Sequence, residues 1–378
     1  MLFYLTIIIV GLACSAITIK TLIGYADFKP IYKIIISALI VLGWFSIFIV
    51  NFLKSQTFLT DSAYASISSF LYTLLGFVLI LFVVITLRDV VWYLIYYILK
   101  LLKIDAWYMD PQNLSLLNKA NMVVIIVALL ISGYSFYEGN RLPNIVNETI
   151  YSNKISRNLR IVQISDLHIT RATSNNKILS IINQVNMLNP DVIVLTGDTI
   201  DDNIRLIQNK VSLLSSLSAP YGVYSVMGNH EFYNDVYEAK KMLEDTGIKF
   251  LFNGGSFIAN SNIYITGLPD FTTMFERINL WRSIKDTKKE DFKILLSHQP
   301  FIVNSLNKDL YDIVLSGHTH GGQIFPMHLL AKKANFYLAG RYNVNGIELI
   351  VSRGAGTWGP PMRLFAPADI VVIDLLKK

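Results

Sequence analysis

Four long stretches without charged residues lie in the first 140 residues, and they set the strongest constraint on how this chain can fold. They run near residues 2–19, 34–53, 66–87 and 120–137. A helix rises about 1.5 Å per residue, so about 20 apolar residues cross the hydrocarbon core of a bilayer. One such stretch could be a buried core helix, but four in succession are not typical of a soluble protein. The sequence therefore predicts an all-helical transmembrane region with four spans.

Composition agrees with this prediction. The chain is 53% hydrophobic and only 16% charged, whereas about a quarter of the residues of a soluble domain are charged. Aromatic residues typical of the membrane interface, such as Trp44, Trp92 and Trp107, lie near the apolar stretches. The first stretch lacks the basic start of a cleaved signal peptide, so we interpret it as a permanent anchor. The single cysteine, Cys14, excludes an intramolecular disulfide.

A shorter apolar run, Val90 to Leu99, follows the third stretch and is itself followed by Lys100 and Lys103. Ten residues are too few to span a bilayer. We expect this run to continue the third helix out of the membrane or to lie in the interface.

The composition changes near residue 140, where Gly, Pro, Asn and charged residues replace the apolar runs. This change predicts a boundary between a transmembrane anchor over 1–140 and a second domain over 141–378. In the second domain, short β-rich runs alternate with amphipathic stretches, which favours an α/β layered fold. The expected strands are 160–164, 192–195, 223–226, 263–266, 293–296, 313–315, 347–351 and 370–373, and the expected helices are 176–188, 203–217 and 237–246.

Polar clusters follow five of these strands directly. They contain five of the six histidines, and the sixth, His328, lies outside them. Ligand groups converge where the strands of an α/β sheet end. Carboxylate, amide and imidazole groups together suit manganese, iron, zinc or a related divalent ion, and no cysteine is available for a thiolate site. The clusters are Asp166-Leu167-His168, Gly197-Asp198, Gly228-Asn229-His230-Glu231, Ser297-His298 and Gly317-His318-Thr319-His320-Gly321.

This ordered series resembles the calcineurin-like metallophosphoesterase superfamily from about Leu159 to the C-terminus. The segments 317–324, 352–359 and 363–370 further resemble the membrane-associated branch that includes phosphodiesterases of the YaeI and YkuE type. A five-part signature is more specific than any single motif. The resemblance implies a layered β-sandwich flanked by helices, two divalent metal ions with manganese as the expected one, and hydrolysis of a phosphodiester or pyrophosphate bond.

The resemblance also implies a role for each residue of the clusters. It places Asp166, His168, Asp198 and His320 on one metal ion, and Asp198, Asn229, His298 and His318 on the other. It makes His230 the general acid that protonates the leaving oxygen. It places Asp201 and Glu231 behind the ligands, where they orient imidazoles or hold a loop. The reaction it implies is in-line attack by a water that the metal pair activates.

Three further features have two interpretations each. Arg353 and Arg363 could clamp a phosphate of the substrate or could be ordinary surface residues. The apolar segments 271–281 and 325–330, the latter followed by Lys332 and Lys333, could form a lid or contact lipid head groups. Core packing is the ordinary expectation for such apolar residues.

The anchor favours a membrane lipid or lipid-linked phosphate as substrate, because tethering raises the local concentration of the enzyme near such molecules. Bacterial hydrolases of lipid A precursors include members of this superfamily, so the sharpest expectation is cleavage of UDP-2,3-diacylglucosamine to the lipid monophosphate and UMP at the bacterial cytoplasmic membrane. A broad-specificity envelope phosphodiesterase is the alternative. A metal-free scaffold would show replaced ligand positions, and a nuclease would carry a basic stripe with aromatics; neither pattern is present.

Basic residues near the spans bear on these two functions. Seven, Lys20, Lys29, Lys33, Arg88, Lys100, Lys103 and Lys119, lie on the side of the first and third loops, and five, Lys54, Arg141, Lys154, Arg157 and Arg160, lie on the side of the C-terminal domain. Basic residues concentrate on the cytoplasmic side. The bias is small, and it favours an external domain, which suits envelope substrates better than a nucleotide-linked lipid.

Overall fold

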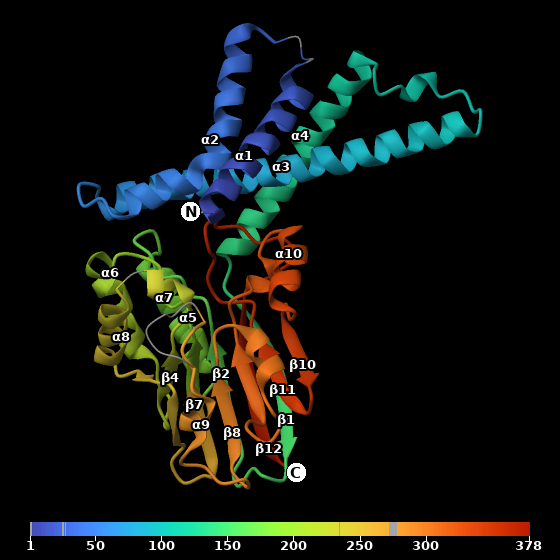
Figure 1. Ribbon diagram of the computed structural model, residues 1–378. Helices are drawn as coiled ribbons and strands as arrows, with labels where there is room; N and C mark the ends of the chain where they lie inside the picture. The colour runs from blue at the N-terminus through green and yellow to red at the C-terminus, as the bar shows by residue number, and fades with distance from the viewer. Residues whose placement is uncertain (1, 25, 27, 234, 272–277) are drawn as a thin grey trace. The chain divides into compact units, whose positions relative to one another are not determined.

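The computed structural model describes residues 2–24, 26, 28–233, 235–271 and 278–378. The chain forms two compact units, Met1–Tyr137 with Gly359–Met362, and Glu138–Trp358 with Arg363–Lys378. Figure 1 labels the helices and strands of both units. Part of the segment 271–281 that was considered as a lid lies outside the described residues.

In its described residues, the first unit contains four helices long and apolar enough to cross a membrane. They are α1 (Leu2–Ile19), which leads into the π-helical turn Lys20–Gly24, α2 (Pro30–Lys54), α3 (Asp61–Leu101) and α4 (Leu114–Asn140). The 41 residues of α3 make a helix about 60 Å long, twice the thickness of the hydrocarbon core of a bilayer. The run from Val90 to Leu99 therefore continues the third helix, as one of the two predictions had it.

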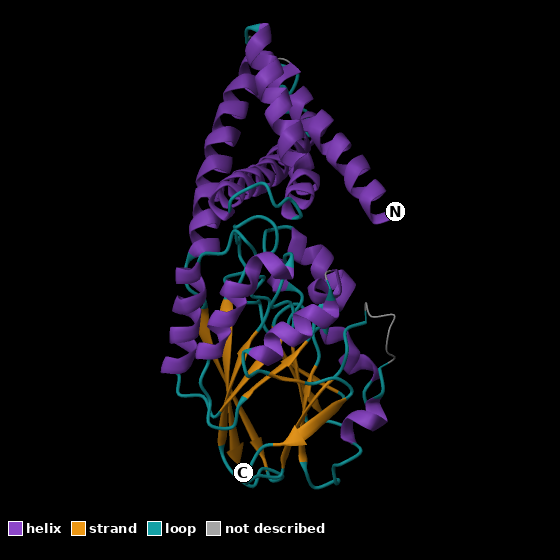
Figure 2. Ribbon diagram, turned by 90° about the vertical axis from the view of Figure 1, so that its left-hand side faces the viewer, coloured by secondary structure: helices purple, strands orange, loops and turns teal. Residues whose placement is uncertain are grey.

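The second unit is built on two six-stranded sheets with strand orders β1-β12-β2-β3-β4-β5 and β10-β11-β9-β8-β7-β6. Figure 2 shows that the strands belong to this unit, with helices and loops around them. The bounds in the first sheet are β1 (Asn144–Ser152), β2 (Leu159–Ile164), β3 (Val192–Thr196), β4 (Val223–Val226), β5 (Lys249–Phe250) and β12 (Asp369–Lys377). Those in the second sheet are β6 (Gly254–Phe257), β7 (Ile263–Gly267), β8 (Phe292–Leu296), β9 (Ile313–Ser316), β10 (Gly340–Val344) and β11 (Ile347–Val351).

The eight predicted strands are all present, and the part of the chain that the structure describes contains four others that were not predicted. The clearest of these is β1, which pairs in parallel with β12 over its whole length. It is an edge strand whose residues are mostly half-buried or exposed. The segment therefore lacks the continuous apolar pattern of a central strand, and this is why the sequence predicted no strand there.

Apolar residues of the central strands fill two layers. Along β2, Val162 and Ile164 pack on the helical side, whereas Leu159 and Ile161 pack between the sheets. Side chains alternate along a strand, so a strand buried on both faces is apolar throughout. The helices α5 (Asn175–Met187), α6 (Ile204–Val211) and α8 (Val236–Asp245) cover the first sheet (Figure 1). A third core lies on the outer face of the second sheet.

The remaining helices are short. They include α7 (Asn229–Tyr233), α9 (Leu280–Ile284) and α10 (Met327–Asn335), with 3-10 turns at Trp107–Met109, Ser212–Ser216, Pro300–Ser305 and His320–Gly322. Among the described residues, α10 adds none to the three cores of the second unit. Core packing is therefore wrong as an expectation for Leu329 and Leu330, which are exposed.

The last turn of α4 belongs to the second unit, and it meets a half-buried lysine there. Arg141 pairs with Glu138 at 3.0 Å, and the Lys177 ammonium donates to the carbonyl of Gly139 at 3.3 Å. Burial and the nearby Arg363 charge lower the pKa of Lys177 to about 8. The chain therefore enters the second unit beside a cation that is costly to keep charged.

Lys177→Met should change how stability depends on pH. The folded-state pKa of Lys177 is about 8 against a usual 10.5, so between these values the unfolded chain binds the additional proton and wild-type stability rises with pH. The stability difference between the variant and the wild type should shift by about 2 kcal/mol across this window. Chemical unfolding of the full chain in detergent at pH 7.5 and 10.5 measures it, with the exposed Lys308→Met as control. A pH-independent difference would contradict the prediction.

Candidate metal centre

The predicted ligands come together where five strands end. The loops after β2, β3 and β4, which are parallel neighbours in the first sheet, carry Asp166, His168, Asp198 and Asn229. The loops after the parallel strands β8 and β9 of the second sheet carry His298, His318 and His320. The amide of Gln163 connects the two sheets beneath the site, donating to the Thr196 hydroxyl at 3.0 Å and to the Ser316 carbonyl at 2.8 Å. Neighbouring parallel strands thus deliver residues distant in sequence to one place.

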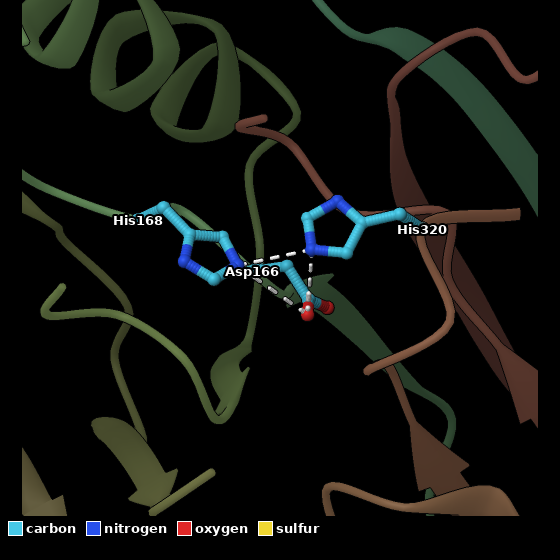
Figure 3. A group of neighbouring side chains, drawn as sticks. All are labelled: Asp166, His168 and His320. Atoms are coloured by element: carbon cyan, nitrogen blue, oxygen red, sulfur yellow. Dashed lines mark hydrogen bonds and ion pairs between the residues drawn. The ribbon is translucent and has the colours of Figure 1, made fainter. Parts of the chain in front are cut away.

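The first donor cluster consists of Asp166, His168 and His320, whose side chains point toward one another in Figure 3. The Nε2 atoms of His168 and His320 are 2.9 Å apart, and His320 Nε2 lies 3.4 Å from Asp166 Oδ1. Ligand atoms about 2.1 Å from one cation lie about 3 Å from each other. The spacing therefore fits donors that share an ion.

The second donor cluster consists of Asp198, His298 and His318. His298 Nε2 lies 3.2 Å from Asp198 Oδ2 and 3.2 Å from His318 Nδ1. The same carboxylate oxygen lies 3.7 Å from His168 Nε2 in the first cluster. Asp198 therefore lies between the two clusters, where a bridging carboxylate would have to be.

Asn229 supplies a separate test of the fit. Its Oδ1 atom is buried and accepts no hydrogen bond from the described residues. Buried amide oxygens are almost always satisfied in proteins, and a cation is one partner that does so. The orphaned oxygen and the two donor clusters fit divalent metal ions.

The electrostatics of the site also suit a cation. Burial and the charge of His298 lower the pKa of His318 to about 4, and burial and His168 lower the pKa of His320 well below its usual value. Burial alone would raise the pKa of Asp198, but the imidazoles around it, His298 first, hold that pKa well below its usual range. The pKa of His298 moves the other way: burial would lower it, but the neighbouring Asp198 carboxylate raises it well above its usual value. Neutral imidazoles and an ionised carboxylate are the forms that ligate metals, so His318, His320 and Asp198 already have the ligating form, and His298 would release a proton when it binds a cation.

Partners behind the ligands fix the imidazole rings. Asp201 Oδ2 lies 3.1 Å from His168 Nδ1, and His298 Nδ1 lies 2.8 Å from the Thr196 carbonyl. Each contact favours a hydrogen on Nδ1 and leaves Nε2 free to bind a cation. Glu231 is completely enclosed and accepts bonds from the backbone N–H groups of Asp198, Ile200 and Gly228 at 2.8–3.1 Å. It therefore holds two ligand loops together.

His230 lies beside the ligands and is partly exposed, as is the ligand His318. Its side chain is 12% exposed, its Nε2 is 4.0 Å from Asp198 Oδ2, and its Nδ1 is 2.8 Å from Asp201 Oδ1. Asp201 thus contacts both His168 and His230. The Trp358 ring lies 6.1 Å from the His230 ring and is itself partly exposed. The histidine is therefore placed to exchange a proton with a molecule at the mouth of the site.

Five of the predicted ligands have a left-handed backbone conformation, with φ of 53° at Asp166, 46° at His168, 50° at Asp198, 71° at His318 and 50° at His320. This region is uncommon for residues other than glycine and costs on the order of 1 kcal/mol or more at each position. Such strain concentrates at functional sites, where the surrounding structure maintains it. It turns each side chain sharply at the end of its strand.

Two glycines permit the close packing of these loops. A Cβ atom at Gly317 would collide with Ser165 Oγ and Asp166 Oδ2, and one at Gly228 would collide with Asp198 Oδ1. Any side chain at these positions would displace a predicted ligand. Glycine is required here for space at the metal site.

Arg363 does not match the predicted phosphate contact. It is completely buried, and its guanidinium donates to the carbonyls of His320, Ala366, Arg353, Gly354 and Gly356. The sequence could not show that the N–H groups of this guanidinium would bind backbone carbonyls. Several of these carbonyls lie near a metal ligand. Arg353 pairs with Asp369 at 3.1 Å and keeps a third of its side chain exposed, so a substrate contact there stays a prediction.

Arg363→Lys should lower the free energy of unfolding by about 2–4 kcal/mol, because an ammonium cannot satisfy all of these buried carbonyls. Arg205→Lys is the matched control, since that side chain is 81% exposed. Thermal unfolding of both variants measures the effect. A variant of wild-type stability with a raised KM would instead restore the substrate-clamp interpretation.

Asp270 and Gln299 were not identified from the sequence. Both are buried, and the Gln299 amide donates to the Asp270 carboxylate at 2.9 and 3.0 Å. The Asp270 charge also acts to raise the pKa of His298 and His318. Asp270 follows β7 closely, so the strand-end reasoning applied to the five clusters could have found it.

Comparisons with known proteins identify the family of this chain. Residues 159–322 match the family described as calcineurin-like phosphoesterase. A metallophosphoesterase of Campylobacter jejuni is 31% identical over 99% of this chain and 98% of its own length. YkuE of Bacillus subtilis, another metallophosphoesterase, is 30% identical over 64% of this chain and 89% of its own length. A Danio rerio protein described as a transmembrane protein with metallophosphoesterase domain is 29% identical over 68% of this chain and 63% of its own length.

The family match and the Campylobacter relative cover the loops that carry the donor clusters. The chain therefore belongs to the calcineurin-like metallophosphoesterase family and is a metal-dependent phosphoester hydrolase with apolar helices long enough to span a membrane.

Proposed function

We propose that the protein is a multi-pass enzyme of the bacterial cytoplasmic membrane that uses two divalent metal ions to hydrolyse a phosphodiester or pyrophosphate bond of a lipid-linked substrate. The observation that carries the proposal is the position of Asp198 between two clusters of donors, beside the accessible His230. The preferred substrate is UDP-2,3-diacylglucosamine, cleaved to the lipid monophosphate and UMP.

Each cluster would hold one cation, and Asp198 would serve both. Asp166, His168 and His320 complete the first set, and Asn229, His298 and His318 complete the second. Two bound cations would neutralise charge on the phosphoryl oxygens and lower the pKa of a water molecule. Manganese suits this mixture of oxygen and nitrogen donors, as do iron and zinc.

The chain's own contribution at the leaving group would come from His230. Asp201 contacts its Nδ1 at 2.8 Å and so keeps that nitrogen protonated, with the ring fixed in one orientation. Nε2 would then carry the proton that passes to the leaving oxygen as its bond to phosphorus breaks. Trp358 and Tyr233, whose rings lie 6.1 and 5.2 Å from the His230 ring, would limit the access of water.

The lipid-linked substrate is supported by the four apolar helices of the same chain. A domain tethered to a bilayer meets membrane-resident molecules at a high effective concentration, whereas a soluble substrate gains nothing from the tether.

A second candidate function is a broad-specificity phosphodiesterase or phosphatase of the cell envelope. The seven-to-five distribution of basic residues favours this alternative, because it would place the second unit outside the cytoplasm. UDP-2,3-diacylglucosamine is made on the cytoplasmic side and requires the opposite orientation. Protease protection of the C-terminus in intact spheroplasts separates the two topologies.

The first experiment is hydrolysis of UDP-2,3-diacylglucosamine by the full chain in detergent with added manganese, compared with bis-p-nitrophenyl phosphate. The proposal expects UMP as the product and its loss in His230→Ala. Activity on the chromogenic ester alone would remove the lipid A precursor as substrate and favour the envelope enzyme.

A further inference from the structure

An exposed apolar surface lies on α10 and a neighbouring loop. We name it the α10 surface and define it as Met327, Leu329, Leu330, Lys332, Lys333, Phe336 and Phe365. Leu329 and Leu330 are each 61% exposed, and Phe365 is 77% exposed. The Phe365 ring packs edge-on against Phe325 with centroids 5.9 Å apart, which joins the loop to the start of the helix. Apolar residues gathered on a surface in this way mark a contact with another molecule or with a membrane.

The α10 surface adjoins the mouth of the metal centre. The Gln323 side chain exchanges two hydrogen bonds with the backbone of Trp358, at 2.8 and 2.9 Å, and the Trp358 ring approaches His230. Gln323 lies between the ligand His320 and the start of α10. The residue after it, Ile324, forms a β-bridge with Leu364, the neighbour of Phe365. The start of the α10 surface is therefore connected through Gln323 and Trp358 to His230.

The charge of the α10 surface favours one kind of partner. Lys332 and Lys333 are exposed in the last turn of the helix, beside the exposed leucines. A short helix that presents apolar residues together with lysines is typical of segments that lie in the interface of an anionic bilayer. A protein partner needs no such combination of cationic and aliphatic side chains.

The place where the chain leaves the membrane helices is also near this surface. Lys177 bonds the carbonyl of Gly139 in the last turn of α4, and Glu138 and Lys177 both interact electrostatically with Arg363. Arg363 is two residues before Phe365. The first residues of the second unit therefore lie close to Arg363, in the loop that also carries Phe365 of the α10 surface.

We propose that the α10 surface docks on the anionic head-group and upper acyl region of the bilayer that holds the four apolar helices. In this position the metal centre faces phosphate esters carried by lipids, because its mouth adjoins the docked helix. The inference rests on the proposed function for the substrate, but the contact with lipid does not depend on catalysis.

Fluorescence quenching in nanodiscs tests the contact directly. Because Cys14 is the only cysteine, Cys14→Ser gives a background for single labels at Leu330→Cys and Phe365→Cys. Matched controls are Met187→Cys on α5 and Trp281→Cys on α9, which are 80% and 76% exposed. Each full-length variant receives an environment-sensitive dye and is placed in phosphatidylcholine–phosphatidylglycerol nanodiscs containing a lipid with a shallow acyl-chain nitroxide.

Docking predicts several-fold stronger lipid quenching at Leu330 and Phe365 than at the two controls, and weaker quenching when Lys332→Glu and Lys333→Glu are added. Equal quenching at all four positions would overturn the proposal. Labels at Leu330 and Phe365 that are shielded from aqueous iodide without being quenched by lipid would also overturn it, since a protein would then cover the surface.

Activity separates this inference from the proposed function. The double variant Leu329→Glu with Leu330→Glu should lower the ratio of UDP-2,3-diacylglucosamine turnover to bis-p-nitrophenyl phosphate turnover by roughly tenfold. A change of this size corresponds to the free energy of burying about one leucine side chain. Lipid quenching without any lipid hydrolysis would support docking and contradict the proposed substrate. If the lipid is hydrolysed, the labels are not quenched by lipid and the double variant leaves the ratio of the two turnovers unchanged, the result would support the proposed substrate and contradict docking.

Discussion

Asp198→Asn should remove most of the bound metal and lower the rate of phosphodiester hydrolysis by roughly a thousandfold or more. The variant keeps the side-chain volume and loses the charge. A single oxygen, Asp198 Oδ2, lies within 3.7 Å of ligands in both clusters, so both metal sites should weaken together. Metal content by mass spectrometry and turnover of bis-p-nitrophenyl phosphate with added manganese measure the two effects.

Asp191→Asn is the matched control for this variant. Asp191 precedes the same strand, β3, at the edge opposite Asp198, where its carboxylate accepts a bond from the Arg160 backbone at 2.8 Å. It should keep its metal and its activity. Two equivalents of metal and full turnover in Asp198→Asn would exclude the bridging role. The unfolding temperature of Asp198→Asn is a second control. If it equals that of the wild type, a loss of metal and activity comes from the site and not from unfolding.

His230→Ala should lower kcat by about 10²–10⁴-fold while leaving the metal content near that of the wild type. The reason is its position, because its ring is partly exposed and its Nε2 is 4.0 Å from the nearest Asp198 oxygen. A general acid matters most for a poor leaving group, so the loss should be larger for an alkyl phosphodiester than for a p-nitrophenyl ester.

The comparison of the two leaving groups tests the role itself. His328→Ala is the control, since His328 lies outside the donor clusters and packs against Phe325 with ring centroids 4.9 Å apart. An equal loss on both esters, or a loss of metal in parallel with activity, would reassign His230 from proton donor to metal ligand.

The orientation of the second unit decides between the two candidate substrates, and the α10 surface bears on both. A docked helix with exposed lysines suits an anionic leaflet, and it would bring either a nucleotide-linked lipid or another envelope lipid to the metal centre. The specificity therefore depends on the side of the membrane as well as on the site. The protease-protection experiment is the one that resolves it.

Much of the architecture was predictable from local patterns in the sequence. The length and uninterrupted apolar character of α1, α2 and α4 predicted membrane helices. A helix of about 20 apolar residues pairs its own backbone hydrogen-bonding groups and is long enough to cross the hydrocarbon core of a bilayer. The central strands β3, β8 and β9 are buried on both faces, so their apolar runs were continuous and recognisable. The edge strand β1 was missed because it is half-exposed and its residues alternate irregularly.

The sequence by itself determined which residues could bind metal, because polar clusters followed consecutive apolar strands and the side-chain types limited the chemistry. Only the tertiary structure showed which donor side chains lie side by side, since that depends on how the edges of two sheets meet. Only the structure showed that Arg363 donates to backbone carbonyls and that Asp201 contacts both His168 and His230. It also showed that the Leu330 side chain is exposed. The physical reason is the distance along the chain over which each property is set. Strand and helix patterns depend on neighbouring residues in the chain. Burial, hydrogen-bond satisfaction and the left-handed ligand conformations depend on contacts between segments more than 100 residues apart, such as Asp166 and His320.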